Sequence, residues 1–126
     1  MRLWHQKLIP KLPRQQLLGQ HRECAALRGL GWGKKHSTVD YVFKYPVEWL
    51  VAYHNVVMME MDDRGYKVDT SWFRSSYRGK TCDNSWVIDY DILCDATELD
   101  IIYPEHDDAY YKECVENLRG KGIVIE

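Results

Sequence analysis

Apolar residues recur every three or four positions in several stretches of the chain, which is the spacing of one buried helix face. The first stretch runs from Arg14 to Arg28 and follows Pro13, whose missing N–H costs nothing in the first turn of a helix. Its expected buried stripe consists of Leu17, Leu18, His21, Cys24 and Ala25. The pattern therefore predicts a helix over residues 14–28, ended by a glycine-rich turn with Gly29, Gly31 and Gly33.

Another face of this helix carries mostly small or polar residues, namely Gln15, Gly19, Arg22, Glu23 and Ala26. Gly19 lies one turn before Glu23, so a side chain is absent where a ligand would approach the carboxylate. Glu23 thus becomes a candidate for chemistry.

Two more helices are predicted, over residues 47–64 and 105–119. The stripe of the first consists of Leu50, Tyr53, His54, Val57, Met58 and Met61, and Gly65 ends it. His54 on this stripe is interpreted as a buried, hydrogen-bonded histidine rather than a ligand. The second begins with three acids that favour the positive end of a helix dipole, and its expected inward side chains are Tyr111, Cys114, Val115 and Leu118.

The segments between these helices give weaker signals. Alternation of apolar and polar residues from Thr38 to Tyr45 predicts an extended, half-buried stretch. Residues 66–104 are aromatic and acidic, and they are compatible with either short helices or long loops. We therefore expect an all-α fold, in which residues 1–126 form a single compact domain of about three main helices with long loops.

Composition adds little to the fold but bounds the environment. No apolar run approaches the roughly 20 residues of a membrane span, and no apolar stretch of a secretory signal follows the basic N-terminus, so a cytoplasmic protein is expected. The four cysteines show no Cys-x-x-Cys spacing, and reduced thiols are expected. Cys24 and Cys114 fall within the helical patterns and are interpreted as small buried hydrophobic residues.

Charge is distributed very unevenly along the chain. Residues 1–44 carry a net charge of +7 and residues 45–126 carry −9, which together make the overall −2. Glu23 and Asp40 are the only acids in the positive part. A positive end is what an enzyme acting on a polyanion needs, and we expect the surrounding cations to lower the pKa of Glu23 and keep it ionised.

Other candidate sites are weak. Asp89 and Asp91 could offer paired carboxylates to a metal, but the glycine and terminal Glu of a calcium loop are missing, so a solvated acidic surface is favoured. His106 beside Glu105 is interpreted as polarity at a helix start. The chain has no phosphate-binding glycine loop and no serine nucleophile elbow, and we expect no metal and no cofactor.

The N-terminus is a stronger candidate. Arg2 is bulky, so the initiator methionine is expected to be retained and Met1 to bear the α-amine. An α-amine has a reference pKa of about 7.7–8.0, against about 10.4 for lysine, and nearby cations enlarge its neutral fraction further. A neutral amine can attack an electrophilic sugar carbon and form a Schiff base.

Two segments carry a resemblance to a known family. Met1-Arg2-Leu3, followed by Gln15-Gln16-Leu17-Leu18-Gly19-Gln20-His21-Arg22-Glu23, resembles the start of the pyrimidine dimer DNA glycosylases of the endonuclease V family. Lys34-Lys35-His36, the stretch 39–44, residues 47–69 and Tyr103-Pro104-Glu105-His106 are similar to its later segments. This chain departs from the family in bearing Met1 instead of a small first residue, in Ala26 where an arginine is expected, and in a longer, more acidic stretch at residues 70–102.

The resemblance implies an endonuclease V-like DNA repair glycosylase with abasic-site lyase activity, which acts on pyrimidine dimers in double-stranded damaged DNA as a monomer. The implied catalytic residues are Met1, Glu23 and Arg22. The implied DNA-binding residues are Arg2, Gln15, Arg28, Lys34, Lys35, His36 and Lys44, with Arg28 standing in for the arginine absent at position 26. Two alternatives stay open, a non-catalytic DNA-binding relative and a helical protein-interaction module that uses the acidic half.

Overall fold

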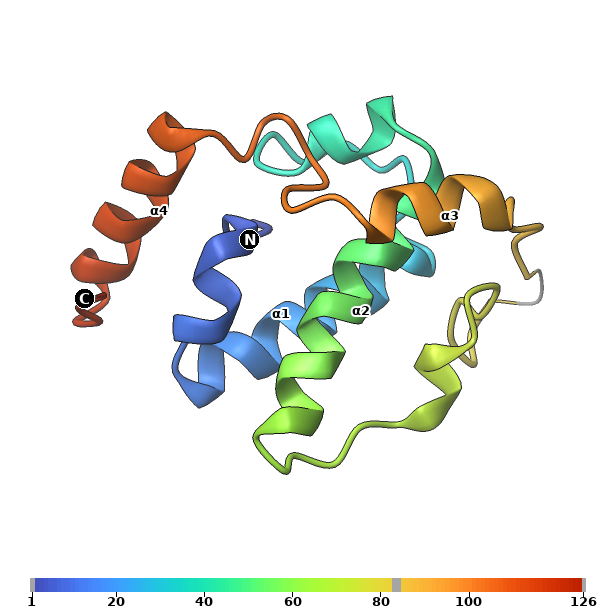
Figure 1. Ribbon diagram of the computed structural model, residues 1–126, viewed down its shortest axis with the longest axis horizontal. Helices are drawn as coiled ribbons and strands as arrows, with labels where there is room; N and C mark the ends of the chain where they lie inside the picture. The colour runs from blue at the N-terminus through green and yellow to red at the C-terminus, as the bar shows by residue number, and fades with distance from the viewer. Residues whose placement is uncertain (1, 83–84, 126) are drawn as a thin grey trace.

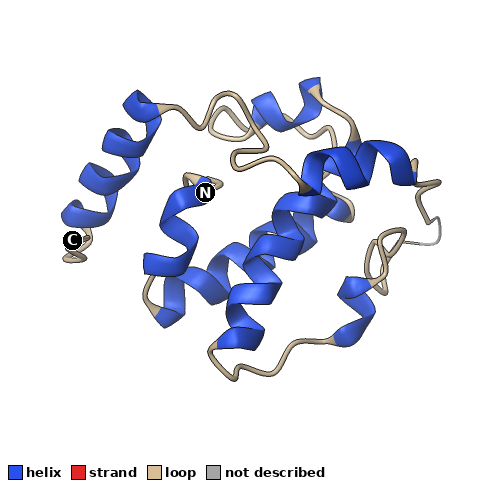
Figure 2. Ribbon diagram, viewed as in Figure 1, coloured by secondary structure: helices blue, strands red, loops and turns tan. Residues whose placement is uncertain are grey.

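All regular structure is helical in the computed structural model of the protein, which describes residues 2–82 and 85–125. The α-helices are α1 (Arg14–Arg28), α2 (Val47–Asp63), α3 (Tyr90–Thr97) and α4 (Asp108–Gly120) (Figure 1). Three short 3-10 helices lie between or before them, namely η1 (Gln6–Lys11), η2 (Asp40–Lys44) and η3 (Thr70–Phe73). Figure 2 shows helices and loops only across these ranges, which confirms the predicted all-α class.

Helix α2 is the centre of the fold. It packs against α1, α3 and η1, and its predicted bounds of 47–64 are confirmed to within one residue. Its side chains at Leu50, Val51, Tyr53, His54, Val57 and Met58 are completely buried. The burial of His54 confirms its interpretation as an interior histidine.

Helix α1 has the predicted bounds, but its buried face is rotated from the predicted one. The interior side chains are Leu17, Gln20, Glu23, Cys24, Leu27 and Arg28, whereas Leu18, His21 and Ala25 are only half-buried. The reason is that three polar residues take interior positions, each for a specific partner or pocket described below. An apolar stripe alone could not show this.

The stretch from residue 38 to 45 was predicted to be extended, and this prediction is wrong. Residues 40–44 form η2, and Val42, which an extended chain would place on the same face as Asp40 and Lys44, is completely buried. Backbone bonds from Val42 N–H to the Val39 carbonyl and from Tyr45 N–H to the Val42 carbonyl close successive turns. An extended segment would need a partner strand, and the described residues contain none.

Residues 66–104, for which the sequence allowed either short helices or long loops, contain η3 and α3. Asp89 begins α3 by accepting hydrogen bonds from the N–H groups of Asp91 and Ile92, so it acts as a helix cap. The final helix starts at Asp108 rather than 105, because Asp107 caps it through Tyr110 N–H. His106 is buried instead of marking a solvated helix start, and its ring bonds Gln6 N–H and the Tyr41 hydroxyl.

The structure also bears on the predictions about membrane spans and cysteines. No helix in the described ranges has the length and apolar character required to cross a membrane. Cys24 and Cys114 are buried as predicted, and the thiols of all four cysteines are unpaired.

Candidate active site

Glu23 is a buried acid that faces open space. The residue is 8% exposed, yet it lines two separate pockets of about 340 and 170 Å³. None of the ion pairs among the described residues involves it. A carboxylate that is withdrawn from bulk water but open to a pocket is free to act on a bound ligand.

Burial also determines the protonation of this carboxyl. Desolvation raises the pKa of Glu23, and His36 lowers it by a smaller amount. The expectation that the positive surroundings lower the pKa is therefore wrong. Charge counted along the sequence omits the burial of the group, and here burial is the larger effect.

The N-terminal segment is held against α1 by Gln20, which lies one turn before Glu23. The Gln20 amide nitrogen donates to the Arg2 carbonyl at 3.0 Å, and Trp4 N–H donates to the Gln20 amide oxygen at 2.6 Å. The Tyr53 hydroxyl lies 2.7 Å from the same oxygen and 2.6 Å from the Trp4 carbonyl oxygen, and its single proton is shared between these two acceptors. The backbone entering the site is thereby anchored on both sides of Leu3.

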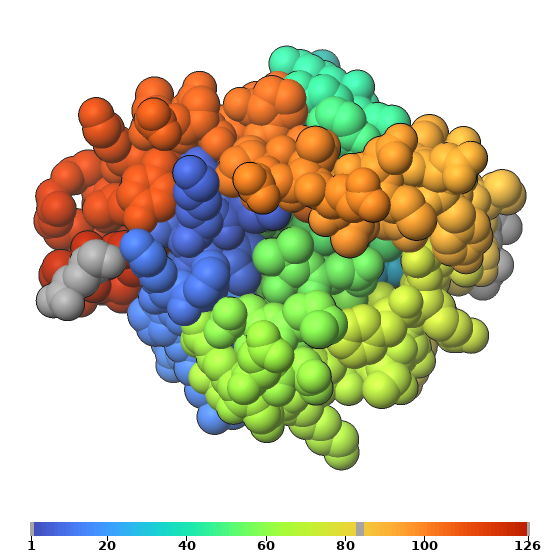
Figure 3. Space-filling view, in the orientation of Figure 1, coloured from blue at the N-terminus to red at the C-terminus, as the bar shows by residue number. Residues whose placement is uncertain are grey.

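Helix α4 completes the setting of this segment. The Tyr110 hydroxyl donates to the Leu3 carbonyl at 2.5 Å, and Arg2 forms an ion pair with Glu113 at 3.0 Å. Figure 3 shows the N-terminal segment packed between α4 and the helices of the core. Met1, the predicted nucleophile, lies outside the described residues.

The 340 Å³ pocket, which we call the Glu23 pocket, collects residues from both ends of the chain. Its walls include Arg2, Gln15, Gly19, Glu23, Asn117 and Lys121. The pocket therefore brings together an acid, one arginine and one lysine. Arg22 is not part of its wall, but a side-chain carbon added to Gly19 would lie 3.7 Å from the Arg22 guanidinium.

Arg22, predicted to be catalytic, and most of the predicted DNA-binding residues are on the surface. Arg22, Lys34, Lys35, His36 and Lys44 are exposed. Lys34, Lys35 and His36 line the 170 Å³ pocket together with Glu23. The structure thus places the basic turn beside the acid, while Lys44 lines neither of its pockets.

Arg28 does not belong to this surface. It is completely buried, and its guanidinium donates to the carbonyls of Trp72, Arg74 and Tyr77 at 2.8–3.0 Å. A DNA phosphate cannot reach it in this structure, so the prediction that Arg28 contacts DNA is wrong. The carbonyl groups of a loop accept from both terminal nitrogens of this cation, whereas its Nε is buried without a hydrogen-bond partner.

Arg28 also orients two histidines. Its Nη1 lies 3.0 Å from His54 Nδ1, which must accept because arginine only donates. His54 Nε2 therefore carries the ring proton and donates to His21 Nδ1 at 2.8 Å. Desolvation lowers the pKa of His54 well below its usual value, so the network is held in this one neutral arrangement.

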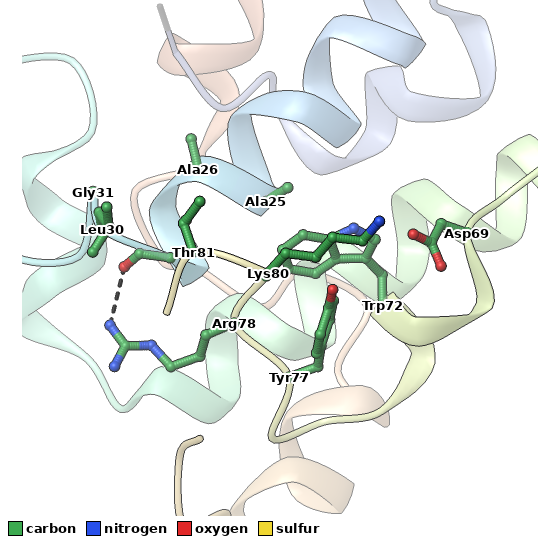
Figure 4. A pocket seen from close by; sticks show the side chains of 12 residues that line it. Ala25, Ala26, Leu30, Gly31, Asp69, Trp72, Tyr77, Arg78, Lys80 and Thr81 are labelled. Atoms are coloured by element: carbon green, nitrogen blue, oxygen red, sulfur yellow. Dashed lines mark hydrogen bonds between the residues drawn. The ribbon is translucent and has the colours of Figure 1, made fainter. Parts of the chain in front are cut away.

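A third pocket of about 480 Å³ lies beyond the end of α1 (Figure 4). Trp72 and Tyr77 stand on one side of it, and Leu30 and Gly31 stand on the other. It shares Ala26 and Gly31 with the 170 Å³ pocket that Glu23 lines. The three pockets are therefore neighbours with shared wall residues, and together they extend from the N-terminal segment along α1 to the loop at residues 69–81.

Sequence reasoning missed the residues that position this site, above all Gln20, Tyr53 and Tyr110. A glutamine between Leu17 and Cys24 at helical spacing was a usable signal, because a polar residue on a buried face needs a partner.

In the two described ranges, no group of three or more His, Cys, Asp or Glu side chains is arranged to hold a metal ion. The chemistry that the Glu23 carboxyl offers beside these pockets is acid–base.

Comparison with known proteins agrees with this setting. A family model described as pyrimidine dimer DNA glycosylase matches residues 1–74, which include α1, α2 and the residues that anchor the N-terminal segment to α1. Searches among curated proteins and solved structures returned no significant match. The match spans more than half of the chain, and the protein therefore belongs to the pyrimidine dimer DNA glycosylase family.

Proposed function

We propose that this protein is an endonuclease V-like DNA glycosylase with abasic-site lyase activity, which acts on pyrimidine dimers through the Met1 α-amine and the Glu23 carboxylate. The observation that carries the proposal is that Glu23 is buried yet open to two pockets beside the anchored N-terminal segment. Family membership supports the glycosylase class and a DNA substrate.

The anchoring of Arg2 supports the role of the amine. The Gln20 amide nitrogen donates to the Arg2 carbonyl, which attaches the start of the described chain to the helix that carries Glu23. An α-amine with a reference pKa of about 7.7–8.0 has a substantial neutral fraction near pH 7.5. Arg2 and Arg22 would enlarge that fraction by opposing a further positive charge.

The proposed reaction begins at C1′ of the damaged nucleotide. The amine lone pair forms a bond to C1′ while the glycosidic bond breaks, and the base leaves with the bonding electrons and takes up a proton. The amine then transfers a proton to Glu23, the sugar ring opens at O4′ with a proton added there, and a protonated imine results. No oxidant or reductant is required.

Strand cleavage follows from the same imine. Removal of a proton from C2′ allows the C3′–O bond to break, and the 3′ phosphate leaves with that electron pair. Water then hydrolyses the imine and frees the amine. A carboxyl whose pKa is raised by burial is better matched to repeated proton transfer near neutral pH than an ordinary glutamate.

Binding of the duplex is assigned to the exposed cations around this site. Arg22, Lys34 and Lys35 are proposed to contact phosphates beside Glu23, with Lys44 further away and Gln15 in the Glu23 pocket. Release of counterions makes such binding fall steeply with salt. We propose that the whole chain acts as one monomeric domain.

Reductive trapping on duplex DNA tests the chemistry. Borohydride reduces an imine to a stable amine, so the wild-type protein should form a covalent adduct with an abasic or dimer-containing duplex. Glu23→Gln should lower the rate of strand cleavage by about 100-fold or more while still binding the duplex. Glu98→Gln is the matched control, because Glu98 is exposed at the end of α3.

The outcomes separate the alternatives. A salt-sensitive complex that never yields an adduct would favour the non-catalytic DNA-binding relative. Absence of any salt-sensitive complex would favour the protein-interaction module. Full cleavage by Glu23→Gln would remove Glu23 from the mechanism.

A further inference from the structure

The turn after α1 presents an apolar side chain in the positive part of the protein. Leu30 is 61% exposed and follows the last residue of α1 by two positions. Seven large hydrophobic residues are exposed in the described ranges, and Leu30 is the one among them that falls within residues 2–44. Leu30 lines the 480 Å³ pocket together with the exposed Lys80, and the exposed Lys34 and Lys35 follow Leu30 closely in the sequence.

This turn is tightly constrained. Gly31 N–H donates to the Ala26 carbonyl at 2.9 Å, and a side-chain carbon on Gly31 would lie 2.7 Å from that oxygen. A side-chain carbon on Gly29 would lie 3.0 Å from the carbonyl oxygen of Arg78. Glycine is therefore required on both sides, and Leu30 is the one side chain at the tip.

A second segment braces the same turn. Arg78 donates to the Arg28 carbonyl at 2.8 Å. It also donates to the Gly29 carbonyl at 3.0 Å, and this second bond is the dashed line in Figure 4. Arg28 in turn holds the carbonyls of the loop that carries Arg78. The two arginines fasten the turn and the loop to each other, so Leu30 projects from backbone that is fixed in place.

The position of the tip relative to the proposed chemistry is favourable. Arg28 is five residues beyond Glu23, which is roughly 8 Å along a helix axis. That length corresponds to about two base steps of 3.4 Å in a DNA strand. Leu30 lies at the rim of the 480 Å³ pocket, while the adjacent Gly31 shares a pocket with Glu23.

We propose that Leu30 is a wedge that enters the base stack of duplex DNA about two steps from the reacting nucleotide. The inference rests on the proposed function. Cations around the tip attract the phosphate backbone, and apolar side chains such as leucine, when held rigidly, unstack base steps and kink the duplex. The wedge opens the duplex, so that the sugar carbon becomes accessible to the site at Glu23.

A comparison of duplex and single-stranded substrates tests this role. On a duplex abasic substrate, Leu30→Ala should form the borohydride-trapped adduct about tenfold or more slowly than wild type, because unstacking a step costs a few kcal/mol. On a single-stranded abasic oligonucleotide the two proteins should react within about twofold of each other, since no stack has to be opened. Leu30→Met, which keeps a long apolar side chain, should restore the duplex rate.

Leu99→Ala is the matched control, because Leu99 is also exposed but lies just beyond α3 in the acidic part of the chain. It should react like wild type on both substrates. Equal rates for Leu30→Ala and wild type on the duplex would overturn the wedge. Equal losses on duplex and single strand would also overturn it, because they would assign Leu30 a structural role.

A chemistry-free readout keeps this test separate from the proposed function. A duplex with 2-aminopurine near a tetrahydrofuran abasic analogue brightens when the probe is unstacked. Wild type should raise its fluorescence and Leu30→Ala should not, even if no adduct ever forms. Failure of trapping with intact brightening would contradict the enzyme mechanism alone, and no brightening by wild type would contradict the wedge.

Discussion

The side-chain amide of Gln20 donates to the Arg2 carbonyl at 3.0 Å, one helical turn before Glu23. Gln20 is 2% exposed and also accepts from Trp4 N–H and the Tyr53 hydroxyl. The start of the chain is thus attached to the helix that carries the candidate acid. The proposed pairing of an N-terminal amine with Glu23 rests on this attachment.

Replacing Gln20 should damage both stability and chemistry. Gln20→Ala leaves the buried Trp4 N–H without its partner, which costs about 1–3 kcal/mol in the free energy of unfolding. The rate of adduct formation should fall further than unfolding explains, because Arg2 loses its anchor. Urea denaturation and trapping at a temperature where the variant is folded measure the two effects. Gln16→Ala, on the same helix, should change the unfolding free energy much less; an equal loss would contradict the role of Gln20.

Glu23→Gln should make the protein more stable and less active at once. Burial raises the folded-state pKa of Glu23, so the folded state opposes its ionised form. This cost is present above the folded-state pKa and disappears as the pH falls through it. The variant should therefore melt at a higher temperature than wild type at pH 7, and the difference should shrink toward pH 4. A lower melting temperature at pH 7 would show that the charged carboxylate is needed for folding.

The acid limb of the pH profile should have two parts. Protonation of the α-amine, whose reference pKa is about 7.7–8.0, lowers the rate of strand cleavage about tenfold per pH unit below that value. A second, steeper fall should begin at the raised pKa of Glu23, because the ionised carboxylate accepts protons. An onset of the second fall at or below the usual glutamate value, measured by single-turnover cleavage across pH 4–8, would be inconsistent with a desolvated Glu23.

Arg28 is expected to contribute to stability and not to DNA binding. Arg28→Lys cannot reach all the carbonyls that the guanidinium bonds, and it should lower the free energy of unfolding by about 2 kcal/mol or more. Hydrogen exchange should become faster in the loop at residues 72–78. The slope of log affinity against log salt should stay unchanged for Arg28→Lys, whereas Lys34→Ala should reduce it by about 1. A reduced slope for Arg28→Lys would restore Arg28 to the DNA surface.

Buried histidines should make the protein sensitive to acid. Burial lowers the pKa of His106 to about 3, so the unfolded chain takes up a proton below pH 6.5 that the folded protein refuses. The folded state is therefore favoured above about pH 6.5 and loses about 1.4 kcal/mol per pH unit, for this one group, as the pH falls toward 3. His106→Gln should flatten this part of the stability profile. An unchanged profile would mean that His106 does not titrate in this way.

The sequence predicted the long helices well because their signals are local. Helix α1 begins after Pro13 and ends before Gly29, and α2 begins after Pro46, so a proline or a glycine in the sequence marks each of these helix ends. The candidate acid Glu23 could also be identified from the sequence, because it is an acid in a basic segment and belongs to a motif that resembles a known family. These are properties of neighbouring residues and need no tertiary information.

The remainder depended on contacts between distant residues. Val42 is buried by tertiary packing that an alternating pattern cannot specify. Arg28 looks like a surface cation until the carbonyls of residues 72–77 are seen around it. The pKa of Glu23 likewise follows from burial, which reversed the sign expected from counting nearby charges.

The central claim is that the Met1 α-amine is the nucleophile, and mapping the trapped adduct tests it most directly. After borohydride reduction, digestion and mass spectrometry should find the sugar remnant on the amine of the N-terminal peptide. Lys121 is the informative alternative, because it is the lysine that lines the Glu23 pocket. A remnant on Lys121, or on any other lysine side chain, would contradict the account.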